Sequence, residues 1–296
     1  MESKYSIIIP HYNMPDLLKR LIVSIPEKED IQVIVVDDCS PDAGSYLSKY
    51  DFLHRTNVEF YIAGKNGGGG AARNIGLKHA KGKWILFADS DDFFVKGFES
   101  IIEEYYNSDC DVIYFNIDSV ESDDVSKKSD RSNSKESLFV RYKATKDDSI
   151  FRLDYPEPWG KMIRRQFIED NKILFDETRV ANDYYFSIQV GCLARKVSAV
   201  NKKIYILTNR VGSVSHAYAD TIDKLMTRID VYKRVDLFLK KHNINMKPSP
   251  LRGLMVLLMK KSPKSFLKTL VSLHKEGINI YSLCIQMFNP KYFSKK

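Results

Sequence analysis

The strongest constraint on the fold is an alternation of short apolar runs with amphipathic segments in the first part of the chain. The apolar runs are rich in β-branched residues and include YSIIIP at 5–10, IQVIVVDD at 31–38, WILFA at 84–88 and VIYFNI at 112–117. Between the first two, MPDLLKRLIVSI at 14–25 places its apolar residues at helical spacing. Apolar strands that alternate with helices indicate a mainly parallel sheet with helices on both faces.

Polar or glycine-rich sequence follows four strands of this predicted sheet. The segments are PHYN after the first strand, DDCSPD after the second, NGGGGAARN after the third and DSDD after the strand at 84–88. Ligands of such sheets bind at the carboxyl ends of the strands. We therefore expect the four segments to meet in one site.

The DSDD segment at 89–92 is the most informative of the four, because three carboxylates this close repel one another unless they are solvated or neutralised. Asp-x-Asp at the end of a strand can present two carboxylates to one divalent cation. Mg²⁺ completes its coordination with substrate phosphates. The alternative is a solvated acidic turn that caps a helix, which the triplet alone favours. The neighbouring strand ends favour the metal site, since each supplies a group that a nucleotide diphosphate needs.

Two of the other three segments leave alternatives open. The second acid of VVDD caps a helix or binds a base or ribose. NGGGGAARN resembles a dinucleotide-binding fingerprint, but its glycines follow the third strand and its acid is a cluster. The absence of a GK[ST] sequence excludes a P-loop. We expect the glycines to let the backbone approach a ligand closely, with Arg73 directed at phosphate.

As an ordered set, the motifs resemble those of the family 2 glycosyltransferases with the GT-A fold, over about residues 4–216. They are IIIPHYN, IVVDDCSPD, NGGGGAARNIGLKHAKGKWILFADSDD, WGKMIRRQFI and NDYYF. The resemblance implies an inverting transferase that uses a nucleotide-diphospho-sugar, most often UDP-linked, with Mn²⁺ or Mg²⁺. Inversion in one step needs no nucleophile from the enzyme, so we expect no covalent intermediate.

The resemblance also implies roles for single residues. Asp183 would be the general base, although the family's Glu-Asp pair reads Asn182-Asp183 in this chain. The metal ligands would be Asp89 and Asp91, joined in some members by a residue that His216 matches. As a lone histidine, His216 is otherwise a surface or packing residue.

The implied nucleotide-sugar contacts come from four of the five motifs. Asp38, with Asp37 beside it, would hold the uracil edge, and Asp89 would share the ribose and the metal. Trp159 and Lys161 match a W-x-K element along the donor–acceptor cleft. The full set implied or expected is Pro10, Tyr12, Asn13, Asp37, Asp38, Gly68, Arg73, Asp89, Ser90, Trp159 and Lys161.

The net positive charge of the chain comes entirely from its C-terminal part. Residues 217–296 contain 16 Lys and Arg against 5 Asp and Glu, whereas residues 1–216 contain 30 against 33. A nucleic-acid enzyme with a basic active face is therefore not expected. After about residue 217 the apolar spacing is helical, which predicts a catalytic domain at 1–216 and a basic helical extension at 217–296. This extension either packs on the catalytic domain or contacts anionic lipid.

Two further features concern local order and location. Residues 119–136 are rich in Ser, Asp and Lys, which predicts a surface loop without core-forming capacity. The N-terminus lacks a long apolar run and the four cysteines are scattered, so we expect no signal peptide and a reducing compartment. This predicts a cytoplasmic protein, peripheral on the inner face of the plasma membrane if the extension binds lipid.

The expected function is transfer of a sugar to a hydroxyl of a glycan or lipid-linked glycan, in bacterial surface polysaccharide or glycoconjugate synthesis. One alternative is a sugar-nucleotide pyrophosphorylase, which would show a glycine-rich loop where this chain has PHYNMPD. Another is a non-catalytic nucleotide-binding module at the membrane. The intact Asp183 and DSDD favour the transferase.

Overall fold

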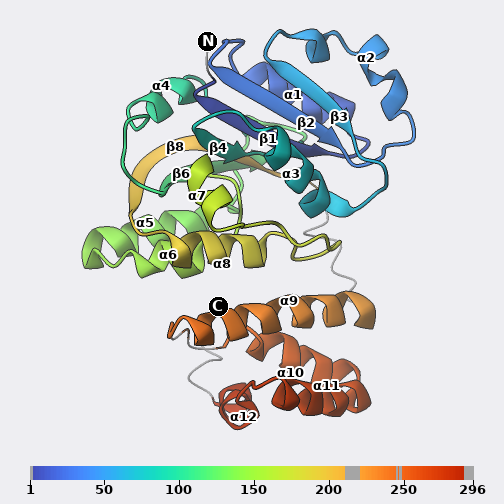
Figure 1. The fold of residues 1–296 in the computed structure, drawn as a ribbon, viewed down its shortest axis with the longest axis vertical. Helices are drawn as coiled ribbons and strands as arrows, with labels where there is room; N and C mark the ends of the chain where they lie inside the picture. The colour runs from blue at the N-terminus through green and yellow to red at the C-terminus, as the bar shows by residue number, and fades with distance from the viewer. Residues whose placement is uncertain (1–2, 211–220, 245, 247–248, 290–296) are drawn as a thin grey trace. The chain divides into compact units, whose positions relative to one another are not determined.

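The chain divides into two compact units, Met1–His216 and Ala217–Lys296. The computed structural model describes residues 3–210, 221–244, 246 and 249–289 (Figure 1). Among these residues, no helix combines the length and the apolar content needed to cross a bilayer.

An eight-stranded sheet forms the centre of the first unit (Figure 1). Its strand order is β3-β2-β1-β4-β7-β6-β8-β5. The strands are β1 (Tyr5–His11), β2 (Ile31–Asp37), β3 (Val58–Ile62), β4 (Trp84–Phe87), β5 (Phe93–Phe94), β6 (Val112–Glu121), β7 (Lys161–Arg164) and β8 (Val197–Asn209).

The parallel part of the sheet is the part that the apolar alternation predicted. β3, β2, β1 and β4 pair in parallel, as do β6 and β8. β7 lies between β4 and β6 and is antiparallel to both, and β5 is antiparallel to β8. The result is a mixed sheet, in which the parallel strands β3, β2, β1 and β4 end in the polar segments.

Helices cover the sheet as the sequence predicts. β1 to β2 and β3 to β4 step across the sheet in opposite directions, so right-handed crossovers place their helices on opposite faces. Further along, α5, α6 and α8 pack beside one another (Figure 1). The helices are α1 (Pro15–Ser24), α2 (Tyr46–Lys49), α3 (Gly68–His79), α4 (Phe98–Glu103), α5 (Asn133–Thr145), α6 (Ser149–Asp154), α7 (Arg165–Asp170) and α8 (Tyr184–Leu193), with short 3₁₀ turns at Ala43–Ser45 and Asp51–His54.

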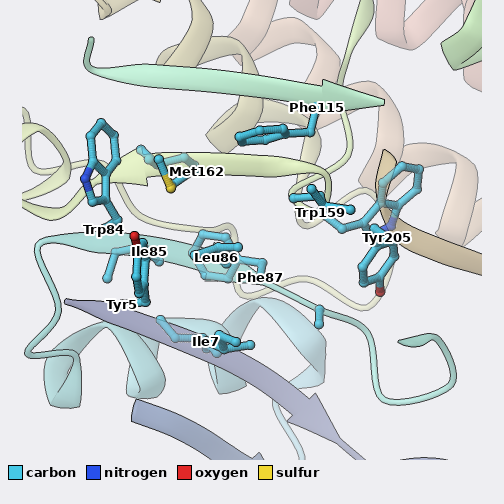
Figure 2. Close-up of a cluster of buried hydrophobic side chains, with 14 of the residues drawn as sticks. Tyr5, Ile7, Trp84, Ile85, Leu86, Phe87, Phe115, Trp159, Met162 and Tyr205 are labelled. Carbon is cyan, nitrogen blue, oxygen red and sulfur yellow. The ribbon is translucent and has the colours of Figure 1, made fainter. Parts of the chain in front are cut away.

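The core of this unit is rich in aromatic side chains around β4, β7 and β6, in the middle of the sheet. Trp84 of β4, Met162 of β7 and Phe115 of β6 are buried across neighbouring strands (Figure 2). At one end of this cluster the rings of Trp159 and Tyr205 stack, with centroids 5.8 Å apart and an angle of 13° between the planes (Figure 2). This packing buries the strands that lead to the candidate site.

The prediction of a surface loop at residues 119–136 holds only for the middle of that segment, where residues 122–131 form neither a helix nor a named strand and are mostly exposed. β6 continues to Glu121, and α5 already begins at Asn133. The Ser119 hydroxyl is buried and donates to the carbonyl oxygen of Ser129 at 2.9 Å. Serine hydroxyls here satisfy backbone groups inside the protein, so a polar composition did not prevent an ordered, partly buried segment.

The second unit is helical in its described residues. Its helices are α9 (Ile222–Lys241), α10 (Arg252–Lys261), α11 (Pro263–Lys275) and α12 (Ile280–Phe288). They bury a separate apolar cluster that includes Leu225, Met255, Leu258 and Leu283. Thr221, Ser262 and Asn279 cap three of the helices by accepting a backbone N–H in the first turn.

Candidate functional site

The carboxyl ends of β1, β2 and β4 bring three of the predicted segments to one edge of the sheet. His11 pairs with Asp37 at the last position of β1 and β2. Ala88, which follows β4, donates its backbone N–H to the carbonyl oxygen of Ile8 at 3.1 Å. PHYN, DDCSPD and DSDD therefore begin side by side.

The glycine run joins this edge through Asp38. The two carboxylate oxygens of Asp38 accept the backbone N–H groups of Gly67 and Gly68, at 2.8 and 2.7 Å. Gly68 has a φ of 84°, and a Cβ there would lie 3.2 Å from the carbonyl oxygen of Thr178. Asp38 thus fixes the turn that starts α3, and the glycine meets both a backbone and a packing requirement.

Arg73 of α3 connects the acidic segment to the predicted base. Its guanidinium donates to Asp89 Oδ1 at 2.5 Å and to Asn182 Oδ1 at 3.0 Å. The buried Arg73 Nε has no hydrogen-bond partner among the described residues. Asn182, where the family pattern has Glu, therefore still supplies an oxygen acceptor. The residue that follows it, Asp183, is held at the start of α8.

Asp183 has the protonation behaviour that a general base needs. Burial raises its pKa to about 6, against the opposing effect of the Arg73 guanidinium and with smaller contributions from the charges of Glu157 and Asp89. A carboxylate with this pKa is ionised at neutral pH and is a stronger base than an exposed Asp.

The acids of DSDD have different environments. Asp91 Oδ2 lies 3.6 Å from Arg210 Nε, and burial together with the charge of Asp89 raises the Asp91 pKa. Asp92 is buried and accepts the Tyr205 hydroxyl at 2.8 Å and the Thr208 N–H at 2.7 Å. Its pKa lies well above the usual value, chiefly because of burial. Asp92 thus ties the turn to β8, and the charges of Asp91 and Asp89 add to the rise of its pKa. Asp89 and Asp91 also repel each other.

Two carboxylates with such repulsion are a suitable donor set for a hard divalent cation. Within the described residues, no group of three His, Cys, Asp or Glu side chains could hold a metal ion. His216, the third predicted ligand, lies outside those residues. Asp89 and Asp91 therefore fit a cation only if the substrate supplies several of the remaining ligands. In the structure itself, Arg73 and Arg210 provide the nearby positive charge.

The remaining predicted residues divide into exposed and interior positions. Tyr12 is 45% exposed, and Asn13 is exposed with a φ of 51°. Pro10, at the end of β1, is half-buried, while Ser90 is buried. The exposed side chains after β1 are the ones available to an approaching ligand.

Trp159 and Lys161 lie in the interior near the join of the two sheet halves. Lys161 is buried, and its Nζ donates to the carbonyl oxygen of Tyr155 at 2.7 Å. Burial lowers the Lys161 pKa to about 7, opposed by the charges of Glu157 and Asp183. Lys161 thus supports the interior of the sheet through its bond to Tyr155.

Several residues of this region were missed in the sequence. His11, inside PHYN, is buried with its Nδ1 2.8 Å from Asp37 Oδ2. Tyr205 and Arg210 approach DSDD from the end of β8, and Glu157 influences both Asp183 and Lys161. His11 lies inside a motif and Glu157 lies two residues before Trp159, whereas Tyr205 and Arg210 reach the site only through the place of β8 in the sheet.

The comparisons with known proteins agree with this geometry. The model of the family "Glycosyl transferase family 2" matches residues 6–171, more than half of the chain. Glycosyltransferase GlyA of Streptococcus pneumoniae is 27% identical over 82% of this chain and 36% of its own length. The poly(ribitol-phosphate) beta-N-acetylglucosaminyltransferase TarS of Staphylococcus aureus is 28% identical over 74% of this chain and 38% of its own length. The chain thus spans little more than a third of these relatives.

Solved structures show the same fold. TarS residues 1–349, crystallised with UDP-GlcNAc, superpose with a TM-score of 0.63 and 24% identity, over 96% of this chain and 81% of that one. A mannosyltransferase of Pyrobaculum calidifontis, solved with GDP-Man and Mn²⁺, gives a TM-score of 0.54 and 13% identity, over 99% and 83%. The mixed sheet with flanking helices is thus the GT-A fold expected from the sequence. With the family match over more than half of its length, the chain belongs to glycosyl transferase family 2.

Proposed function

We propose that this protein is an inverting glycosyltransferase that transfers a sugar from a nucleotide-diphospho-sugar, most often UDP-linked, to a hydroxyl of a glycan or lipid-linked glycan. The observation that carries the proposal is the position of Asp183, which directly follows Asn182, the hydrogen-bond partner of Arg73 in the predicted diphosphate region. Burial raises the Asp183 pKa to about 6, opposed by the charge of the Arg73 guanidinium. Base and donor-binding residues therefore act on one another electrostatically. A non-catalytic module would not need this coupling.

In the proposed reaction, Asp183 accepts the proton of the acceptor hydroxyl as the oxygen attacks the anomeric carbon. The hydroxyl is a weak nucleophile at neutral pH, so removal of its proton during attack lowers the barrier. Attack from the face opposite the diphosphate inverts the configuration in one step. The nucleoside diphosphate departs with the bonding electron pair.

We further propose that Asp89 and Asp91 hold Mn²⁺ or Mg²⁺ together with the donor. Burial and the charge of Asp89 together raise the Asp91 pKa, and a cation would relieve the repulsion between the two carboxylates. When bound, the cation would stabilise the negative charge of the departing diphosphate. The unpartnered Nε of Arg73 is a remaining donor for a phosphate oxygen. The third ligand proposed from the sequence, His216, is retained as part of this proposal.

The nucleotide-sugar contacts remain those proposed from the sequence, with two changes in how they act. Asp37 and Asp38 already accept hydrogen bonds from protein groups, so we propose that they shape the binding turns. Trp159 and Lys161 are interior, so we propose that they support the cleft wall. The contacts with the donor itself are then Pro10, Tyr12, Asn13, Gly68, Arg73, Asp89 and Ser90.

The acceptor class follows from the relatives. TarS is named for transfer to poly(ribitol-phosphate), and another relative, the succinoglycan biosynthesis protein ExoO of Rhizobium meliloti, is named for polysaccharide synthesis. We propose a role in bacterial surface polysaccharide or glycoconjugate synthesis on the cytoplasmic side of the membrane. The pyrophosphorylase alternative gains no support, because the family match covers the motifs on which both readings depended.

We also propose that the C-terminal helices contact the membrane surface. Leu267 and Val271 on α11 are 62% and 57% exposed, and Lys264, Lys268 and Lys275 are exposed on the same helix. Apolar side chains flanked by lysines suit the headgroup region of an anionic bilayer.

A panel of UDP-, GDP- and dTDP-sugars tests the enzymatic proposal. The purified chain, with Mn²⁺ or with EDTA, is assayed for release of the nucleoside diphosphate in the presence of glycan acceptors, and ligand binding is followed by thermal shift. We expect metal-dependent stabilisation and turnover with a UDP-sugar. A chain that binds none of these nucleotides with Mn²⁺ would contradict the proposal.

A further inference from the structure

The turns that follow β1 and β2 are joined by a hydrogen-bond network centred on Asp37. The side chains of His11 and Asp37 are fully buried. His11 Nδ1 lies 2.8 Å from Asp37 Oδ2, and the Ser40 hydroxyl donates to the same oxygen at 2.7 Å. The Ser40 N–H donates to Asp37 Oδ1 at 2.6 Å. Protein donors therefore occupy both oxygens of this carboxylate.

Two consecutive backbone amides of the turn after β1 end on this network. Asn13 N–H donates to Ser40 Oγ at 2.7 Å, and Met14 N–H donates to His11 Nε2 at 3.1 Å. Because Nε2 accepts a hydrogen bond, it carries no proton, so Nδ1 carries the proton that is donated to Asp37. One carboxylate thus orients the two acceptors that hold Asn13 and Met14.

The turn needs such tethers because its backbone is unfavourable. Asn13 has a φ of 51°, and Cys39 in the facing turn has a φ of 66°. The left-handed region is disfavoured for residues other than glycine, although Asn tolerates it better than most. The His11 ring also packs edge-on against Tyr46, with centroids 5.6 Å apart. Tyr12, the exposed side chain of the turn, therefore lies next to two backbone amides that are fixed by buried acceptors.

We infer that His11, Asp37 and Ser40 are positioning residues that hold Tyr12 and Asn13 in the conformation that receives the nucleotide of the donor. The inference rests on the proposed function, since it takes Tyr12 and Asn13 as donor contacts. It assigns His11 a role and makes Asp37 act through its neighbours. The network sets the affinity for the nucleotide and leaves the chemistry at Asp183 unchanged.

The test measures UDP binding by calorimetry with Mn²⁺ for His11→Phe and Ser40→Ala. Phe keeps a ring against Tyr46 but cannot accept from Met14, and Ala cannot accept from Asn13. Each variant also removes a donor to Asp37, and each is expected to bind UDP about tenfold more weakly because a turn amide loses its acceptor. Ser40→Thr, which keeps the hydroxyl, is expected to restore wild-type affinity. Amide hydrogen exchange at Asn13 and Met14 should become faster in the two weak binders.

Ser6→Ala is the matched control. The Ser6 hydroxyl is buried at the opposite end of β1, donates to Gln32 at 2.6 Å and accepts the Gly82 N–H at 2.8 Å. Its loss should lower the thermal midpoint without changing UDP affinity. The inference is overturned if wild type binds UDP and both His11→Phe and Ser40→Ala bind it within about twofold of Ser6→Ala. If wild type itself binds none of UDP, GDP and dTDP with Mn²⁺, the proposed function fails instead.

Discussion

At the scale of single residues, the three acids of DSDD show how position in the fold assigns roles to identical side chains. Asp89 accepts a hydrogen bond from Arg73, and Asp91 lies near Arg210. Both oxygens of Asp92 already accept hydrogen bonds, from Tyr205 and Thr208. A spacing pattern cannot distinguish them, because their partners come from α3 and β8. Only the two acids with cationic neighbours keep oxygens for a ligand.

Replacement of Asp183 by Asn tests the proposed base. Asn keeps the shape but cannot accept a proton, so kcat should fall by roughly 10²–10⁴-fold while UDP binding stays unchanged. In wild type, the base is lost as it protonates, so kcat should decline as the pH falls through about 6. Rates are measured by UDP release from pH 5 to 8. A near-normal rate for Asp183→Asn with normal donor binding would exclude this assignment.

Alanine at Asp92 should change stability, whereas alanine at Asp91 should change metal-dependent binding. Asp92→Ala removes the acceptor of two buried hydrogen bonds and should lower the free energy of unfolding by about 2–4 kcal/mol. Asp91→Ala should leave the unfolding free energy within about 1 kcal/mol and abolish the Mn²⁺-dependent increase in UDP affinity. Chemical denaturation and calorimetry separate the two effects. Equal destabilisation by both substitutions would mean that Asp91 is also structural.

At the scale of elements, the parallel strands could be predicted because each is an apolar run with its own crossover helix. The antiparallel insertion of β7 could not, since KMIR is too short for a periodicity and its place depends on pairing with β4 and β6. The ordered ends of the segment 119–136 were missed for a related reason, because serine hydroxyls satisfy buried backbone groups only in the folded state. The direction of the parallel strands was enough to predict which polar segments form the site. It was not enough to predict the residues that reach the site from β8.

The contact of α3 with the segment before α8 is the element-scale link between the donor side and the base. A Cβ on Gly70 would lie 2.0 Å from the carbonyl oxygen of Asp176 and 2.9 Å from Asn182. Gly70→Ala should therefore push this segment away and lower the free energy of unfolding by about 1–3 kcal/mol, with a loss of activity. Gly64→Ala, with no atom within 4 Å of the new Cβ, is the control. Unchanged stability in Gly70→Ala would show that α3 and this segment adapt freely.

At the scale of the whole molecule, charge and chemistry are assigned to different units. The first unit, with its slightly negative sequence, contains every proposed catalytic and donor-binding residue. The second has its own apolar core and most of the surplus lysines. Within the described residues of α12, the exposed side chains Tyr281, Ile285 and Phe288 recur at helical spacing. An exposed apolar stripe on α12, together with the lysines of α11, favours a binding partner whose surface is both apolar and anionic.

Charge reversal on α11 tests the membrane proposal in the full-length chain. The triple substitution of Lys264, Lys268 and Lys275 by Glu should abolish flotation with vesicles containing anionic lipid, because a Lys near such a surface contributes about 1 kcal/mol. The same reversal at Lys49, Lys96 and Lys143, exposed lysines of the first unit, changes the net charge equally and should leave flotation intact. Wild-type binding should weaken with added salt and be absent with neutral vesicles. If both triple variants lose binding equally, overall charge and not the α11 surface is responsible. If wild type does not float at low salt, the C-terminal helices pack against protein instead.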